Sequence, residues 1–246
     1  MWAGGSNSSI AVSIALWSSA SFALKSEASD IGSRGRSALV MITLEQVSRR
    51  IFNDPSWFVK SIVGTFLLIV PIAHFFAFGY LYRQMLAVRH GDVSGLPEWE
   101  DWRGLFVDGL RAFLIVLVLG VLPIFVGWVV SLPIVPFLGA LGYLPMVPGF
   151  LFAAPLSAAG IYRYQRREEF AEAFDFSVLL RMVARTRSQL IVPTLAYLGL
   201  LFVFSPLFPY ALFTGALLVF SFYALIFRQS EAAFRSAASG HSVIHR

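Results

Sequence analysis

The sequence contains no cysteine and few charged residues. Without cysteine the chain has no disulfide, no thiolate metal site and no cysteine nucleophile. Charged residues make up 13% of its 246 residues, whereas a soluble domain carries roughly 25%. Apolar residues make up 57%, which excludes both a soluble domain with a polar surface and a disordered chain. The composition therefore predicts a membrane protein with several transmembrane segments.

The sequence also lacks the signatures of common catalytic sites. The motifs His-Glu-x-x-His and Gly-x-Ser-x-Gly and the phosphate-binding loop do not occur, and the chain has only 4 histidines. We therefore expect a protein that is not an enzyme and that holds no metal and no cofactor. The basic residues flank long apolar segments, which is typical of membrane topology, so we expect no binding to nucleic acid.

Three long segments contain no charged residue: 61–82, 112–162 and 188–227, of 22, 51 and 40 residues. Because a transmembrane helix needs about 20 apolar residues, these lengths predict roughly one, two and two spans. Proline interrupts the second segment near 131–133 and the third near 205–209, where we expect turns between helices. The prediction is an all-α, polytopic transmembrane helix bundle of about five spans.

The third predicted span is rich in helix breakers. Between Pro133 and Pro155 it contains three further prolines and three glycines. Broken helices are tolerated at membrane depth where neighbouring helices satisfy the freed backbone groups. We therefore expect this span to be kinked and packed inside the bundle.

The arginines indicate the orientation of the chain. With five spans, those between spans one and two, between spans three and four, and after span five fall on one side, which the positive-inside rule makes cytoplasmic. Arg49, Arg50 and Lys60 are then left outside. The conflict disappears if Pro71 breaks the first segment into a short hairpin that enters and leaves on one side, or that lies partly in the interface. Four spans then remain; the length of the segment favours five.

The first forty residues differ from the rest of the chain. Residues 1–40 are rich in serine, and we expect an extension that does not fold, with Met41 as a natural initiator. Residues 10–24 match a signal-peptide core in length, yet the basic segment that should precede such a core is missing. We expect a single transmembrane domain, 41–237, followed by a C-terminal tail, 238–246.

Several short motifs resemble a known family. The motifs are Asp54-Pro55-Ser56-Trp57, Gly79-Tyr80-Leu81, Leu96-Pro97-Glu98-Trp99-Glu100-Asp101-Trp102, Phe106-Val107-Asp108-Gly109-Leu110, Ala154-Pro155-Leu156 and Ala173-Phe174-Asp175-Phe176. They are similar to those of the family catalogued as domain of unknown function 4013, found in archaeal and bacterial membrane proteins, and the resemblance covers 51–237. It implies a prokaryotic polytopic membrane protein. The family has no assigned activity, so the resemblance supplies no catalytic residues.

The loop between the first two predicted spans holds most of the candidate functional residues. Gly91 is expected to end the preceding helix as a left-handed C-cap. Glu98, Trp99, Glu100 and Asp101 then follow in succession. The preferred interpretation is an interfacial elbow, with tryptophan at headgroup level and the acids in water. The alternative is a docking or ligand site, although this carboxylate spacing matches no established metal loop.

Three further candidates lie in or beside the predicted spans. Asp108 and Arg111 share a helix face at the start of span two, where we expect an anchoring ion pair, with Asp108 near the positive end of the helix dipole. His74 is the only group of the first segment that titrates near neutral pH. A proton or ligand role is one hypothesis for it, and a hydrogen bond to a carbonyl freed by Pro71 is the simpler one.

The segment 176–187 predicts an interfacial helix on the cytoplasmic side, with Asp175 as its N-cap. Its apolar face is formed by Phe176, Leu179, Leu180 and Val183, and arginines gather toward its C-terminal end. Such a helix attracts anionic lipid. The expected partners are therefore membrane lipids and, at the cytoplasmic loops, a protein partner.

These features lead to two functional hypotheses. The first is a non-catalytic, multi-pass protein of the plasma membrane that organises partners or lipids at its cytoplasmic face. The second is a small-solute transporter that uses the Pro- and Gly-broken third span, although no internal repeat is visible. A lipid-modifying enzyme would need clustered acids or histidines at membrane depth, and the charge-free segments hold no such cluster.

Overall fold

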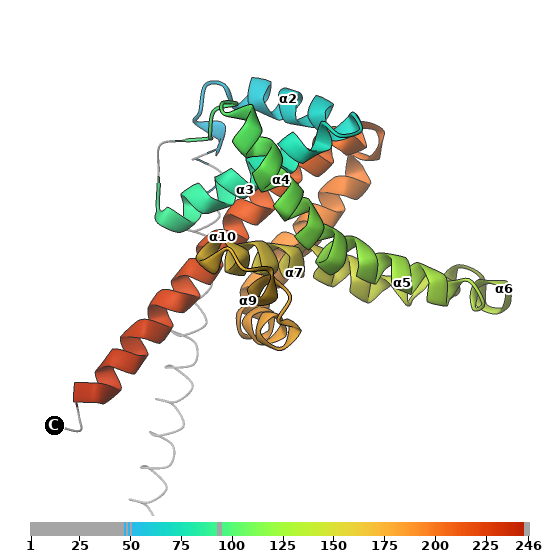
Figure 1. Cartoon of the computed structure of the whole chain (residues 1–246). Helices are drawn as coiled ribbons and strands as arrows, with labels where there is room; N and C mark the ends of the chain where they lie inside the picture. The colour runs from blue at the N-terminus through green and yellow to red at the C-terminus, as the bar shows by residue number, and fades with distance from the viewer. Residues whose placement is uncertain (1–46, 48, 50, 93–94, 244–246) are drawn as a thin grey trace, which may run out of the picture. The chain divides into compact units, whose positions relative to one another are not determined.

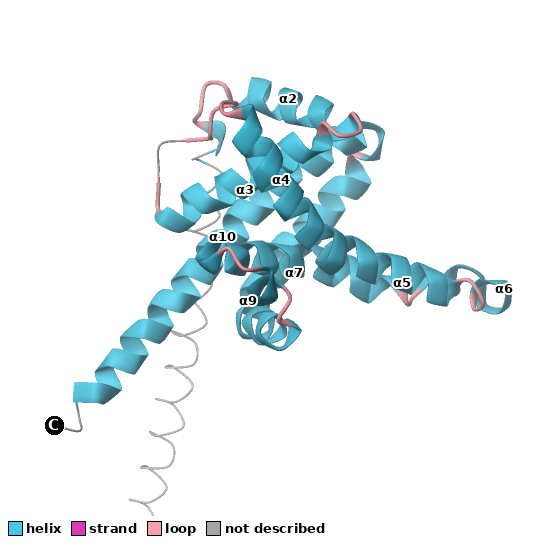
Figure 2. Ribbon diagram, viewed as in Figure 1, coloured by secondary structure: helices cyan, strands magenta, loops and turns pink. Residues whose placement is uncertain are grey.

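A computed structural model describes residues 47, 49, 51–92 and 95–243. All of them belong to one structural unit, Gln46–Arg246. This part of the chain consists of helices and connecting loops and contains no strand (Figure 2). The all-α prediction is therefore confirmed. The predicted N-terminal extension, 1–40, lies outside the described residues.

The first charge-free segment forms two helices rather than one. α2 (Trp57–Ile69) and α3 (His74–His90) pack against each other. The chain turns between them at Pro71, which has no N–H and which favours the extended conformation seen in Val70. Ile72 completes the turn with a left-handed φ of 71°. The segment is therefore broken at Pro71, as the hairpin alternative requires.

Four helical stretches are long and apolar enough to cross a membrane: Trp102–Ser131, Val135–Arg167, Phe176–Val203 and Ser205–Ala232. The expected count of five is thereby corrected to four, because α2 has only 13 residues and is about 20 Å long. The predicted turns after 131 and at 205–209 separate these stretches. Their elements are α4 (Trp102–Val116), the π-helical turn η1 (Leu117–Val121), α5 (Leu122–Ser131), α6 (Val135–Leu138), the 3₁₀ turn η2 (Gly139–Tyr143), α7 (Met146–Arg167), α9 (Phe176–Val203), the 3₁₀ turn η3 (Ser205–Leu207) and α10 (Phe208–Val243), with the short α8 (Phe170–Ala173) between α7 and α9.

α10 contributes more buried apolar residues than any other helix of the described chain. In Figure 1 it passes α3 and α7, and it also packs against α2 and α9. The apolar window of its span is 78% buried, against between 11% and 22% in the other three spans. Those three therefore turn much of their apolar surface outward, where lipid is the expected surrounding. α10 also continues through most of the predicted tail, as far as Val243.

The third predicted span is broken, but at its edge. The α-helix is interrupted at η2, and α7 then runs for 22 residues through Pro148 and Pro155. Near the break Phe137 is 85% exposed, so the prediction that this part packs inside the bundle is wrong. The breakers from Pro133 to Pro145 lie where the chain turns back from α5 into α7, and the remaining ones lie within α7. Gly127 and Gly149 bring the two helices together, since a Cβ on either would come within 2.9 Å of the opposite backbone.

The predicted interfacial helix is not a separate element. Residues 176–187 are the first turns of α9, which continues in one line into the span because no Gly or Pro interrupts it before Pro193. The predicted N-cap is confirmed, since the Asp175 carboxylate accepts from the Val178 N–H at 3.2 Å. Leu179 is buried whereas Leu180 is 53% exposed, so the predicted apolar face is divided between the protein core and the outside.

Candidate functional site

The loop 95–101 carries most of the candidate residues, and we call it the acidic loop. It follows α3, which ends as predicted: Gly91 is left-handed with φ of 80°, and its N–H donates to the Val88 carbonyl. The acidic loop then returns alongside α3 and leads into α4. Three sets of contacts attach it to the helices.

The first attachment is Lys60 of α2, which is only 4% exposed. Its ammonium group donates to Asp54 at 3.0 Å, to Glu98 at 2.7 Å and to the Leu96 carbonyl at 3.2 Å. All three of its N–H protons are therefore used, which is what a buried lysine requires. Sequence reasoning placed Lys60 in a loop on the opposite side and missed this role.

Asp54 completes the Lys60 cluster. Its carboxylate also accepts from the Ser56 N–H at 2.8 Å, the Ser56 hydroxyl at 2.6 Å and the Leu96 N–H at 3.2 Å. Burial acts to raise the pKa of Asp54, but the hydrogen bonds from Ser56, Lys60 and Leu96 outweigh it and hold that pKa well below its ordinary value. Asp54 therefore stays ionised and keeps the acidic loop tied to the start of α2.

The second attachment is an aromatic stack around Trp99. Its ring stacks on Tyr80 at 4.2 Å, on Trp102 at 6.0 Å and on Phe213 of α10 at 6.5 Å. The fully buried Tyr80 donates its hydroxyl proton to the Pro97 carbonyl at 2.8 Å. Trp99 is therefore a packing residue that holds the loop rather than a free interfacial ring. Trp102, by contrast, is 48% exposed and fits the predicted elbow.

The third attachment is Arg83 of α3. Its guanidinium group donates to Asp101 at 2.7 Å, to Asp108 at 3.2 Å and to the Glu100 carbonyl at 3.2 Å. Arg111 lies 3.8 Å from Asp108, so the predicted pair exists, but Arg83 is the closer partner. One planar, five-donor side chain thus joins α3, the acidic loop and α4.

Asp101, rather than Asp108, caps α4. The helix begins at Trp102, which puts Asp108 beyond the first turn and corrects its predicted place near the positive end of the dipole. The Asp101 carboxylate accepts from the Gly104 N–H at 3.1 Å, and the residue is left-handed with φ of 50°. The hydrogen bond from Arg83, together with that from Gly104, lowers the pKa of Asp101.

The cap predicts a difference between two substitutions of Asp101. Asp101→Asn keeps an acceptor for the helix N-terminus and tolerates the left-handed conformation, so its melting temperature should stay near that of the wild type. Asp101→Ala loses the cap and is strained at positive φ, and it should melt a few degrees lower. Thermal unfolding of the purified protein in detergent compares them. Equal melting temperatures for the two variants would contradict the cap.

His74 lies apart from the acidic loop, at the start of α3. Its ring packs against Phe75 at 4.2 Å and against Phe113 of α4 at 5.2 Å. The hydrogen bond to the Val70 carbonyl, next to Pro71, is donated by the backbone N–H of His74, at 3.1 Å, and not by its ring. These contacts make His74 part of the aromatic packing between α3 and α4, and they add nothing to the hypothesis of a proton or ligand role.

Arginines at the end of α7 form further ion pairs. Glu172 of α8 pairs with Arg163 and, at 2.8 Å, with Arg167. Glu231 of α10 lies 3.6 Å from Arg166. These residues join α7 to α8 and α10.

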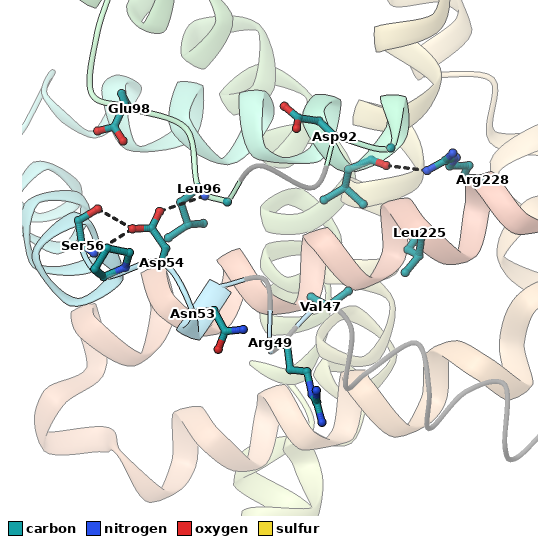
Figure 3. A pocket seen from close by; sticks show the side chains of 14 residues that line it. Val47, Arg49, Asn53, Asp54, Ser56, Asp92, Leu96, Glu98, Leu225 and Arg228 are labelled. Carbon is teal, nitrogen blue, oxygen red and sulfur yellow. Dashed lines mark hydrogen bonds between the residues drawn. The ribbon is translucent and has the colours of Figure 1, made fainter.

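A cavity of about 830 Å³ lies beside the acidic loop (Figure 3). Its polar lining includes Asp54, Glu98 and Arg228. In Figure 3 the Asp54 carboxylate points to Ser56 and Leu96, and Arg228 donates to the Val88 carbonyl at 3.4 Å. Within the described ranges no three His, Asp or Glu side chains are grouped so as to hold a metal ion. The cavity therefore has a lining of mixed charge whose groups are largely engaged by the protein itself.

The fold and this site define the class: an all-α, multi-pass membrane protein of uncharacterised role. Residues 62–220 match the family described as protein of unknown function, DUF4013, and the chain belongs to that family. The resemblance predicted from the motifs is therefore confirmed, and the matched range includes Tyr80, Arg83 and the acidic loop. No curated protein and no solved structure matches the chain.

Proposed function

We propose that this protein is a non-catalytic component of the plasma membrane of a prokaryotic cell, and that it organises a partner at its cytoplasmic face through the acidic loop. The observation that carries the proposal is that this loop has exposed carboxylates on a backbone that the helices hold in place. Its carboxylates remain outside, with the Glu98 and Asp101 side chains 65% and 64% exposed, while Lys60, Tyr80 and Arg83 hold its backbone. A loop ordered in advance loses little conformational entropy on binding.

The chemistry of the partner follows from the charges. Glu98, Glu100 and Asp101 are exposed within four positions, which favours a basic segment of a protein and disfavours anionic headgroups. Membrane lipids remain the expected partners of the outward faces of the spans.

We propose that the protein is not catalytic because its ionisable groups are engaged in ion pairs. Asp54, Glu98, Asp101, Asp108 and Glu172 each pair with Lys or Arg. In the part of the chain that the structure describes, these ion pairs connect helices and engage the carboxylates, whereas general acid–base catalysis needs a group that is free to exchange a proton with a substrate.

The cytoplasmic orientation is proposed from contacts between helix ends. Lys60 at the start of α2 pairs with Glu98 of the acidic loop, and Arg228 of α10 donates to Val88 at the end of α3. With four spans these basic positions share one side, and the positive-inside rule assigns that side to the cytoplasm. The conflict of the five-span arrangement does not arise.

The transporter hypothesis has less support. The groove beside the third predicted span measures about 510 Å³ and is lined by apolar residues of η1, α5, α7 and α9, together with Pro145. A solute site at membrane depth requires polar groups to replace the water that the solute loses. The break at η2 lies at an exposed edge rather than at such a site.

A photoreactive amino acid at position 100 tests the docking proposal in native membranes. The Glu100 carbonyl, not its side chain, accepts from Arg83, so the replacement leaves this attachment in place. We expect a discrete protein adduct that is lost at high salt and in a Glu98→Lys/Asp101→Lys variant. A matched probe at Val129, an exposed residue of α5, should not give it. Adducts with lipid only at position 100, or the same adducts at both positions, would refute the proposal.

A further inference from the structure

The exposed residues of α2 are all apolar, and two of its three buried residues are polar. Lys60, Ser61 and Gly64 are its buried residues, whereas Phe66 and Ile69 are 66% and 57% exposed. A surface helix of a water-soluble protein has the reverse arrangement. The outward face of α2 therefore requires an apolar environment.

The turn after α2 is equally apolar. Val70 and Ile72 are 50% and 67% exposed. The Val70 N–H donates to the Phe66 carbonyl at 3.3 Å, and the His74 N–H donates to the Val70 carbonyl at 3.1 Å. Pro71 has no N–H at all. An irregular backbone is tolerated at membrane depth when its polar groups are satisfied in this way.

α2 lies along a candidate span. Asp54, just before α2, lines the same cavity as Arg228, which is near the end of the span in α10. Further along, Gly64 packs so closely on the Phe213 ring, near the start of that span, that a Cβ would overlap it. α2 thus runs antiparallel to α10 from its charged end, and its length of about 20 Å is less than the roughly 30 Å of the hydrocarbon layer.

We propose that α2 and the turn at 70–73 form a re-entrant hairpin with α3, and that membrane lipid covers its outer face. The hairpin enters the bilayer from the charged side and turns back within the hydrocarbon, with acyl chains against Phe66, Ile69 and Ile72. The Lys60–Glu98 ion pair keeps its entry and its exit on the same side. The outward face of α2 then continues the lipid-facing surface of the spans. This inference is independent of what binds the acidic loop.

The absence of native cysteine makes the test direct. Single cysteines at Phe66 and Ile72, both outward-facing, would carry a nitroxide label in vesicles of phosphatidylcholine and phosphatidylglycerol. Glu100→Cys serves as the aqueous control. Val192→Cys, at a position 57% exposed in the span of α9, serves as the lipid control. Electron paramagnetic resonance then compares accessibility to oxygen, which partitions into lipid, and to a water-soluble nickel chelate.

We expect the labels at 66 and 72 to match Val192→Cys, with strong relaxation by oxygen and nearly complete loss of relaxation by the chelate. Chelate accessibility equal to that of Glu100→Cys would place α2 in water and overturn the proposal. Protection from both reagents would also overturn it, because protein would then cover the face. Dipolar broadening between labels would in that case identify a second copy of the chain.

Discussion

Replacing Lys60 by methionine is expected to destabilise the protein by about 3 kcal/mol, the cost of removing one partner of a buried ion pair. Methionine fills a similar volume, so the loss is electrostatic rather than one of packing. Asp54, with a side chain only 10% exposed, would keep its charge without the ammonium group that balances it. The free energy of unfolding, measured by denaturant titration in mixed micelles, gives the effect.

Glu98→Gln is the matched control for Lys60→Met. The Glu98 side chain is 65% exposed and can be hydrated once its charge is removed, so this substitution should cost less than about 1 kcal/mol. An effect of Glu98→Gln as large as that of Lys60→Met would contradict the burial of the Lys60 cluster.

The contribution of Asp54 also makes the free energy of unfolding depend on pH. The folded pKa of Asp54 lies below the unfolded value of about 3.9, so its stabilisation is present above about pH 4 and is lost as the pH falls further.

Gly79→Ala should destabilise the protein by more than about 3 kcal/mol, because it forces apart the two most closely packed helices. A Cβ at Gly79 would overlap the Leu105 carbonyl of α4, and one at Gly109 would overlap the Phe75 carbonyl of α3. Backbone atoms cannot move aside as a flexible side chain can. Separating α3 from α4 would also pull Arg83 away from Asp101 and Asp108. Thermal unfolding and the yield of monodisperse protein measure the effect.

Gly199→Ala provides the control within the same chain. Gly199 is helical in α9, and nothing lies within 4 Å of the position of its Cβ. Alanine is the better helix former, so this variant should be neutral or up to about 1 kcal/mol more stable. If Gly79→Ala were as stable as Gly199→Ala, the close crossing of α3 and α4 would be wrong.

The features that sequence predicted best depend on local chemistry. Missing charge predicted five spans, of which four are found. Pro133 and Pro206 marked turns, and the end residues Gly91 and Asp175 followed from capping preferences. Each of these signals is read within a few neighbouring positions. The family resemblance also came from short motifs, and its predicted range of 51–237 includes residues 62–220, which match the family.

The features that sequence missed depend on contacts between distant segments. Lys60 and Glu98 are far apart in sequence, and a lysine beside an apolar segment is usually a surface anchor, so its burial was not expected. The signal available was weak: Lys60 is one of only two lysines in a chain rich in arginine. Whether 61–82 forms one span or two shorter helices depended on whether Pro71 bent the helix or reversed the chain direction. Periodicity alone does not decide between these two. Similarly, 176–187 has the composition of an interfacial helix, and only its continuity with α9 assigns it to a span.

The measurement that tests the account most directly is side-specific labelling of single cysteines with a membrane-impermeant maleimide. The informative positions are Asn53, before the hairpin; Glu100, after it; and Ser205, at the start of the fourth span. The four-span account predicts that Asn53→Cys and Glu100→Cys react from the same, cytoplasmic side and that Ser205→Cys reacts from the other. Labelling of Asn53→Cys and Glu100→Cys from opposite sides would mean that 61–82 crosses the membrane, and it would contradict the account.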